Sequence, residues 1–307
     1  SRMLPASNPA AIATALQTER FPGQTGTPIE IITFDGANKV DALNEYANRI
    51  SQVPGIVGVV PPQVIGEDVR IVAYQSMLPR TPESQKLIHD LRDVKAPTGT
   101  LIGGVAADYT DSQDGISRTL PWAFGWIAIS VLLLVFVFTG SIILPIKAVL
   151  LNVLSLAATM GVLTWVFIDG NLQWLVGSFT VTGSLDTSIV ILIAVVVFGL
   201  SMDYELFLLS RIREEHLEGR SNVESVATGL QRSARIITAA AVLLAVVFAA
   251  FVTSGVTSIK TMGFGVALAV LLDATLIRAL LVPALMRLMG ERNWWAPKSL
   301  QRFTLKH

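Results

Sequence analysis

The second half of this chain contains five apolar segments that are each long enough to cross a lipid bilayer. A membrane-spanning helix needs about 20 mainly apolar residues. Segments of this kind lie at about 121–139, 142–168, 186–210, 233–253 and 262–289. Because the hydrocarbon layer offers the backbone no hydrogen-bond partners, such segments must be helical. We therefore predict an all-α membrane domain of five transmembrane helices over residues 119–290. Only Gly140 and Ser141 separate the first two spans, which predicts a tight helical hairpin.

Residues 1–118 differ from the rest, because most Asp and Glu residues of the chain lie before residue 120. Segments with strand character cover 28–34, 56–65, 69–74 and 100–106. Segments with helical character cover 8–20, 39–52 and 81–93. After the first helix, the order β-α-β-β-α-β is that of a ferredoxin-like unit. We therefore predict an α+β domain over 1–118, in which Pro61 and Pro62 make the second strand an edge strand or end it early.

Basic residues predict how the spans are oriented. Five arginines lie between residues 211 and 235, and five basic residues follow from Arg287 onward. On the opposite side, 169–186 has no Lys or Arg and 254–261 has only Lys260. The positive-inside rule then places the tail, residues 291–307, in the cytoplasm. An odd number of spans makes the α+β domain extracytoplasmic. No signal peptide precedes that domain, so we expect the segment that delivers it to lie upstream in a longer protein.

Asp203 is a carboxylate inside the third apolar span, with Tyr204 and Glu205 directly after it. A charged side chain at the bilayer centre costs about 2.5–3.5 kcal/mol on insertion scales. It must be neutralised, paired or hydrated, and each condition suits a group that takes up and releases protons. A structural ion pair or an interhelical hydrogen bond is the alternative. We interpret Asp203 as a functional residue, because intramembrane carboxylates are typical of ion and proton pathways.

A second carboxylate, Asp273, lies near the middle of the last span, and Arg278 follows five residues later. Five residues correspond to about 140° around an α-helix, so the two side chains are not expected to face each other directly. Arg278 would then extend toward the cytoplasm or pair with another helix. For Asp273 and Arg278, an ion pair and a role in proton traffic both remain open.

Several functions have no chemical basis in this sequence. A net charge of zero argues against a nucleic-acid partner. There is no Cys, and all three His residues lie outside the predicted spans, so neither a His-based metal site nor an intramembrane Ser-His enzyme is expected. No P-loop is present. We expect no catalytic residues and no cofactor, and any transport work must draw on an ion gradient or on another subunit.

Two motifs are the most specific in the chain: Gly199-x-x-x-Asp203-Tyr204-Glu205 and the ending Asn293-Trp-Trp-Ala-Pro297. Weaker ones are Arg211-Ile-Arg-Glu-Glu215, Asp273-Ala-Thr-Leu-Ile-Arg278, Val282-Pro-Ala-Leu-Met286 and Phe21-Pro-Gly-Gln-Thr-Gly-Thr-Pro28. Together they resemble the mycobacterial-membrane-protein-large (MMPL) family of the resistance–nodulation–division (RND) superfamily. The resemblance covers essentially the whole chain. It implies a transporter of twelve spans in two halves, of which this chain matches the second porter domain and the last five spans.

The resemblance also implies a function and a location. In the family, an Asp-Tyr pair from each half meets in the membrane to form a proton relay, and here only Asp203 and Tyr204 can supply such a pair. The implied activity is export of lipids, glycolipids or other hydrophobic compounds, driven by protons across the bacterial inner membrane. The missing N-terminal half would be a required partner, while self-association and accessory proteins are left open. Two alternatives remain: a protein-export factor of the SecDF kind, and a non-transporting scaffold or sterol-sensing-like membrane protein.

Overall fold

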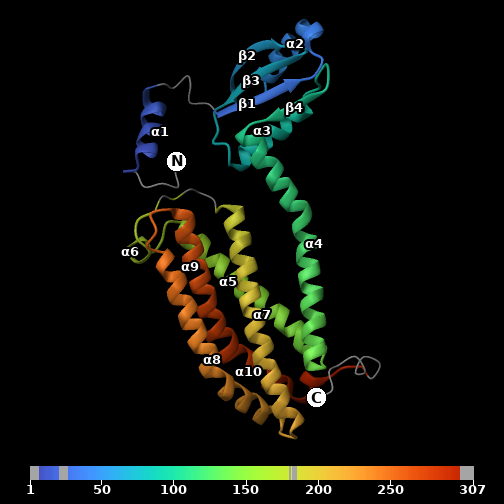
Figure 1. Ribbon diagram of the computed structural model, residues 1–307, viewed down its shortest axis with the longest axis vertical. Coiled ribbons are helices and arrows are strands. Elements are labelled where there is room, and N and C mark those ends of the chain that lie inside the picture. The colour runs from blue at the N-terminus through green and yellow to red at the C-terminus, as the bar shows by residue number, and fades with distance from the viewer. Residues whose placement is uncertain (1–6, 21–26, 180, 182–184, 298–307) are drawn as a thin grey trace. The chain divides into compact units, whose positions relative to one another are not determined.

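The computed structural model describes residues 7–20, 27–179, 181 and 185–297 (Figure 1). Most of the motif at 21–28 and the last ten residues of the tail lie outside these residues. The chain divides into two compact units, one over Ile12–Trp122 and one that contains the helices from Ala123 onward. The first unit is an antiparallel sheet with helices, and the second is a helical bundle.

The α+β unit has the predicted ferredoxin-like order. After helix α1 (Pro9–Arg20) and strand β1 (Thr27–Thr33) come a 3-10 turn, η2 (Ala37–Lys39), and helix α2 (Val40–Ser51). The remaining elements are strands β2 (Ile56–Ile65) and β3 (Asp68–Gln75), helix α3 (Pro82–Asp93) and strand β4 (Thr100–Gly103). The four strands pair antiparallel in the order β2-β3-β1-β4.

One hydrophobic core holds this unit together. Alternate residues of the central strands, such as Ile29 and Ile31 in β1, are fully buried. They pack against apolar side chains that recur with helical spacing, such as Leu43 in α2 and Leu91 in α3. Period-2 strands and 3.6-period helices therefore place their apolar residues on one shared face, as the pattern predicts.

Strand β2 is an edge strand, as its two prolines predict. Among the described strands it pairs only with β3, and the register shifts between Val60 and Gln63, where Pro61 and Pro62 lie. Proline has no N–H to donate to a neighbouring strand, so its position at a sheet edge leaves no ladder hydrogen bond broken.

The expectation of a strand over 100–106 is wrong at its end. Strand β4 stops at Gly103, and helix α4 (Val105–Thr139) begins two residues later. The turn lies at Gly104, whose φ of +102° favours glycine, and a Cβ there would lie 2.9 Å from the carbonyl oxygen of Pro28. Ala106 is buried in the core as part of α4. The first span is therefore the second part of a longer helix, and Pro121 lies inside α4 and not at its start.

The second unit contains the remaining predicted spans as helices. They are α5 (Ile143–Phe167), α7 (Thr187–Leu217), α8 (Asn222–Phe251) and α9 (Thr257–Leu272), with the short α6 (Gln173–Val176) between α5 and α7. The last span continues through a π-helical segment, η3 (Asp273–Leu281), helix α10 (Val282–Met289) and the 3-10 turn η4 (Gly290–Trp294). In the described part of the chain, five helices, including α4, are long and apolar enough to cross a membrane.

The predicted hairpin of the first two spans is tight only at its turn. Gly140 has a φ of +68°, and α5 begins at Ile143. From this turn α4 and α5 diverge (Figure 1). Val135 of α4 and Leu144 of α5 still belong to one buried cluster beside the turn. The prediction of a packed hairpin is therefore wrong along most of the two helices, because α5 packs instead against α7 and α9.

The C-terminal Asn-Trp-Trp motif is fixed to the base of the bundle. The buried Asn293 donates from its Nδ2 to the carbonyl oxygens of Met286 (2.6 Å) and Gly290 (2.7 Å). Its own carbonyl oxygen accepts a hydrogen bond of 2.5 Å from the Ser141 hydroxyl, in the turn between α4 and α5. The Trp294 ring stacks on His216 at 4.3 Å between centroids. The motif thus connects η4 to the turn before α5 and to α7.

Candidate functional site

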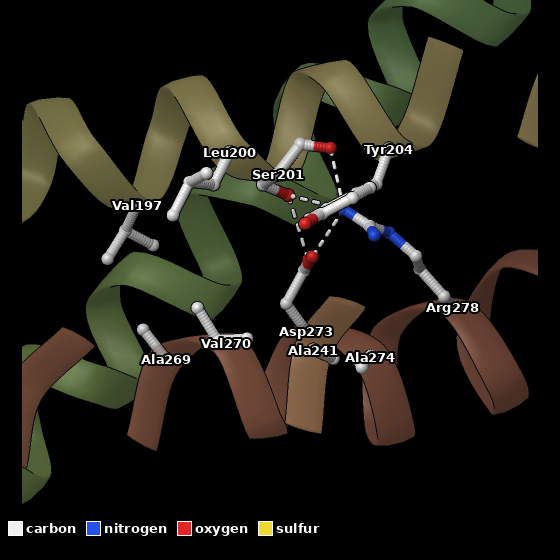
Figure 2. A pocket seen from close by; sticks show the side chains of 10 residues that line it. All are labelled: Val197, Leu200, Ser201, Tyr204, Ala241, Ala269, Val270, Asp273, Ala274 and Arg278. Carbon is white, nitrogen blue, oxygen red and sulfur yellow. Dashed lines mark hydrogen bonds and ion pairs between the residues drawn. The ribbon is translucent and has the colours of Figure 1, made fainter. Parts of the chain in front are cut away.

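A buried group of polar side chains connects α7 to the last span (Figure 2). Arg278 forms an ion pair of 2.5 Å with Asp273, and only 3% and 6% of these side chains are exposed. Ser201 of α7 donates a hydrogen bond of 2.8 Å from its hydroxyl to Asp273. The backbone oxygen of Ser201 accepts one of 2.6 Å from Arg278. The guanidinium lies 4.9 Å from the centre of the Tyr204 ring, within range of a cation–π interaction.

The expectation that Asp273 and Arg278 do not face each other is wrong, and the helix type explains why. The estimate of 140° assumed a regular α-helix with 3.6 residues per turn. The segment Asp273–Leu281 is instead a π-helix, in which residue i is bonded to residue i+5. Positions five apart therefore lie one above the other, and Arg278 reaches Asp273 directly. π-Helical turns are often found at functional sites.

The polar group lies beside a small pocket whose other walls are apolar. Val197 and Leu200 of α7 line it, together with small side chains of α8 and α9 such as Ala241 and Ala269 (Figure 2). Ion pairs in such surroundings lose their hydration, so each charge depends on its partner. Among the described residues, no group of three or more His, Cys, Asp or Glu side chains could hold a metal ion.

Asp203 is not part of this buried group. Its side chain is exposed on the surface of the described bundle, although it lies in the middle of an apolar span. No hydrogen bond or ion pair reaches its carboxylate from the residues that the structure describes. Tyr204, the next residue, turns toward Arg278 instead. The structure thus brings Tyr204, Asp273 and Arg278 together and leaves Asp203 on a separate face of α7.

Glu205 is a buried residue whose importance we did not expect from the sequence. Its side chain turns into the bundle and only 2% of the residue is exposed. Its Oε2 accepts a hydrogen bond of 3.2 Å from Nδ2 of Asn152 on α5. Its Oε1 has no hydrogen-bond partner among the described residues. Lys147, a buried cation of the same helix α5, lies within electrostatic reach. The sequence feature that could have indicated this polar group is the presence of a lysine and an asparagine, Lys147 and Asn152, inside one apolar span.

The α+β unit and the bundle with its membrane-spanning helices define the fold class of this chain. A solved heavy metal efflux pump has the same fold, with a TM-score of 0.50 and 11% identity, over 91% of this chain and 37% of that chain. The family model described as "MMPL family" matches residues 2–304. The chain therefore belongs to the MMPL family.

Curated relatives are similar over nearly the whole chain. A putative membrane protein of Streptomyces coelicolor is 37% identical over 98% of this chain, which covers 42% of that protein. The trehalose monomycolate exporter MmpL3 of Mycobacterium tuberculosis is 35% identical over 98% of this chain and 33% of its own length. The mycolic acid-containing lipids exporter MmpL11 of Mycolicibacterium smegmatis is 35% identical over 92% and 31%. The chain thus spans about a third to two fifths of these relatives.

Proposed function

We propose that this chain is the second half of a proton-driven exporter of lipids, glycolipids or other hydrophobic compounds in the bacterial inner membrane. Asp203 takes up and releases the proton, and Tyr204 connects it to the buried ion pair. Residues 1–118 form the extracytoplasmic porter domain, and the tail lies in the cytoplasm. The names of the relatives support the substrate class, since one is a trehalose monomycolate exporter and another is an exporter of mycolic acid-containing lipids.

The observation that carries this proposal is the exposed carboxylate of Asp203 on an apolar helix. Burial of a charged carboxylate in hydrocarbon costs about 2.5–3.5 kcal/mol on insertion scales, so a bare charge is not stable there. Without a partner in the described bundle, the group is neutralised by a proton or by a residue from the rest of the transporter. In both cases, the charge of the Asp203 carboxyl group depends on the groups that pack against this face of α7.

The contacts around Tyr204 suggest how a change of charge produces movement. Tyr204 follows Asp203 on α7, and its ring lies against Arg278 of η3. Arg278 in turn holds Asp273 and the Ser201 backbone. Proton uptake at Asp203 removes one negative charge next to this connection, and α7 and the last span adjust relative to each other. A titration that biases two helix packings is a known form of molecular switch.

The test is Asp203→Asn in the full-length transporter. The carboxamide keeps the shape of the side chain and cannot ionise, so proton-dependent export should fall to the background level while insertion and folding persist. Glu214→Gln is the matched control, because it makes the same chemical change on the same helix at an exposed residue paired with Arg211. Export at the wild-type rate by Asp203→Asn would rule out the relay, whereas an absence of export by the wild type itself would favour a non-transporting scaffold.

A further inference from the structure

We propose that Glu205, Asn152 and Lys147 form the cytoplasmic exit for the transported proton, with Glu205 as the group that receives it. This inference rests on the proposed function and adds the second leg of the proton path. During the transport cycle the Glu205 carboxylate, on the inward face of α7, takes up a proton and later gives it to water on the cytoplasmic side. Lys147 remains protonated throughout.

Glu205 lies where a proton acceptor is needed. It is one helical turn after Ser201, so both side chains project from the same inward face of α7. Ser201 is hydrogen-bonded to Asp273 and approached by Arg278, which places Glu205 next to the buried ion pair. The charges within electrostatic reach of Glu205 are Arg278 and Asp273 on the last span and Lys147 on α5.

One oxygen of Glu205 is free to take the proton. Oε2 is occupied by the hydrogen bond from Asn152, whereas Oε1 has no partner within the described residues. A buried polar atom without a partner is rare in proteins and calls for an explanation. A carboxylate that alternates between the charged and the protonated form during a transport cycle is such an explanation.

The polar path leaves α7 at this point and continues on α5. The inward residues of α7 directly after Glu205 are the apolar Leu208, Leu209 and Ile212, which belong to a buried hydrophobic cluster. The next inward residue, Glu215, is already paired with Arg220 and Arg232. On α5, by contrast, Lys147 lies five residues before Asn152, about 7–8 Å along the helix axis toward the turn with α4 and about 140° around the helix. Nζ of Lys147 donates a hydrogen bond of 3.4 Å to Oδ1 of Asn293.

Asn293 marks the end of the path. It lies in η4, and its neighbours Glu291, Arg292 and Trp295 are exposed. The positive-inside rule assigns this side of the bundle to the cytoplasm. Lys147 is 7% exposed, so its ammonium acts on Glu205 with little screening by solvent. Its attraction stabilises the carboxylate that remains after the proton has left, which favours release toward the cytoplasm.

The experiment separates proton-driven transport from substrate exchange in proteoliposomes that hold the full-length transporter. Radiolabelled trehalose monomycolate is the probe, and wild-type exchange of it is established first. Glu205→Gln should lower transport driven by a pH gradient by about 100-fold or more, the range of a lost proton transfer. Exchange of labelled for unlabelled probe at equal pH on both sides needs no net proton movement. Because no proton transfer is lost, the exchange rate should stay within about twofold of the wild type.

Lys147→Met should give the same separation, and the double variant Glu205→Gln/Lys147→Met distinguishes a path from a structural pair. A purely structural pair leaves a lone buried charge in each single variant and none in the double variant, so transport would recover. The exit path predicts that transport stays lost. Ser155→Ala is the control, because it removes a buried hydroxyl from α5 beyond Asn152.

Gradient-driven transport at the wild-type rate by Glu205→Gln would overturn the exit path, and so would loss of exchange together with transport. Recovery in the double variant would also overturn it. The proposed function is judged separately by Asp203→Asn in the same assay. If Asp203→Asn abolishes gradient-driven transport while Glu205→Gln does not, only the exit path fails.

Discussion

The ion pair between Asp273 and Arg278 predicts an asymmetry between two single substitutions. In Asp273→Asn the guanidinium loses a carboxylate at 2.5 Å and stays in a site where 3% of its side chain is exposed. Arg278 cannot shed its proton, so an uncompensated charge remains buried. Removing one partner of a buried ion pair costs about 3–5 kcal/mol, and we expect Asp273→Asn to lower the free energy of unfolding by an amount in this range.

Arg278→Met should cost less, because the remaining carboxyl group can take a proton and become neutral. Ser201 still donates its hydrogen bond to Asp273. What is lost is the pair of contacts from Arg278 to Asp273 and to the Ser201 carbonyl, which corresponds to about 1–3 kcal/mol for buried groups left without partners. The double variant Asp273→Asn/Arg278→Met should recover part of the loss, since no lone charge remains.

The assay is the free energy of unfolding of the full-length protein in detergent micelles, measured for the wild type, both single variants and the double variant. Arg211→Met is the control, because its exposed pair with Glu214 at 2.8 Å should contribute less than about 1 kcal/mol. The reasoning is refuted if Arg278→Met destabilises more than Asp273→Asn. It is refuted equally if neither single variant differs from the control.

Two further predictions follow from packing and from topology. Gly229→Ala should cost about 1–3 kcal/mol by overpacking, because its Cβ would lie 2.7–2.9 Å from Ile212; Gly161→Ala, with no atom within 4 Å, should not destabilise in the same unfolding assay. Lys86→Cys should react with an impermeant thiol reagent on intact cells, whereas Val223→Cys should react only after permeabilisation. Both positions are exposed and the chain has no cysteine of its own. Labelling of Val223→Cys from outside would reverse the orientation.

Much of the fold was predictable because burial follows simple periods. Alternation in β1 and helical spacing in α2 identified the sheet and its covering helices before the structure. The periods did not locate the end of β4, because an apolar residue such as Ala106 would be buried whether it continued the strand or began a helix. Only the left-handed backbone at Gly104 decides between them, and a glycine alone does not predict its own φ.

The site was less predictable, because a membrane helix is apolar on every side. The roughly 100° step per residue separates Asp203 from Glu205 by about 200°, but it does not say which of them points inward. In α7 both faces carry Val, Ile and Leu, so no apolar stripe marks the core. The structure turns Glu205 inward and leaves Asp203 exposed. The contact between Asp273 and Arg278 was missed because nothing in the sequence reveals a π-helical segment.

The most direct measurement of the central claim is proton movement by the full-length transporter in proteoliposomes that contain a pH-sensitive dye. With an imposed pH gradient and trehalose monomycolate as the probe, the wild type should move protons at a rate that depends on the probe. Asp203→Asn should reduce this probe-dependent flux to that of empty liposomes, while Glu214→Gln should leave it unchanged. A probe-dependent proton flux in Asp203→Asn equal to that of the wild type would contradict the role of Asp203 as the proton carrier.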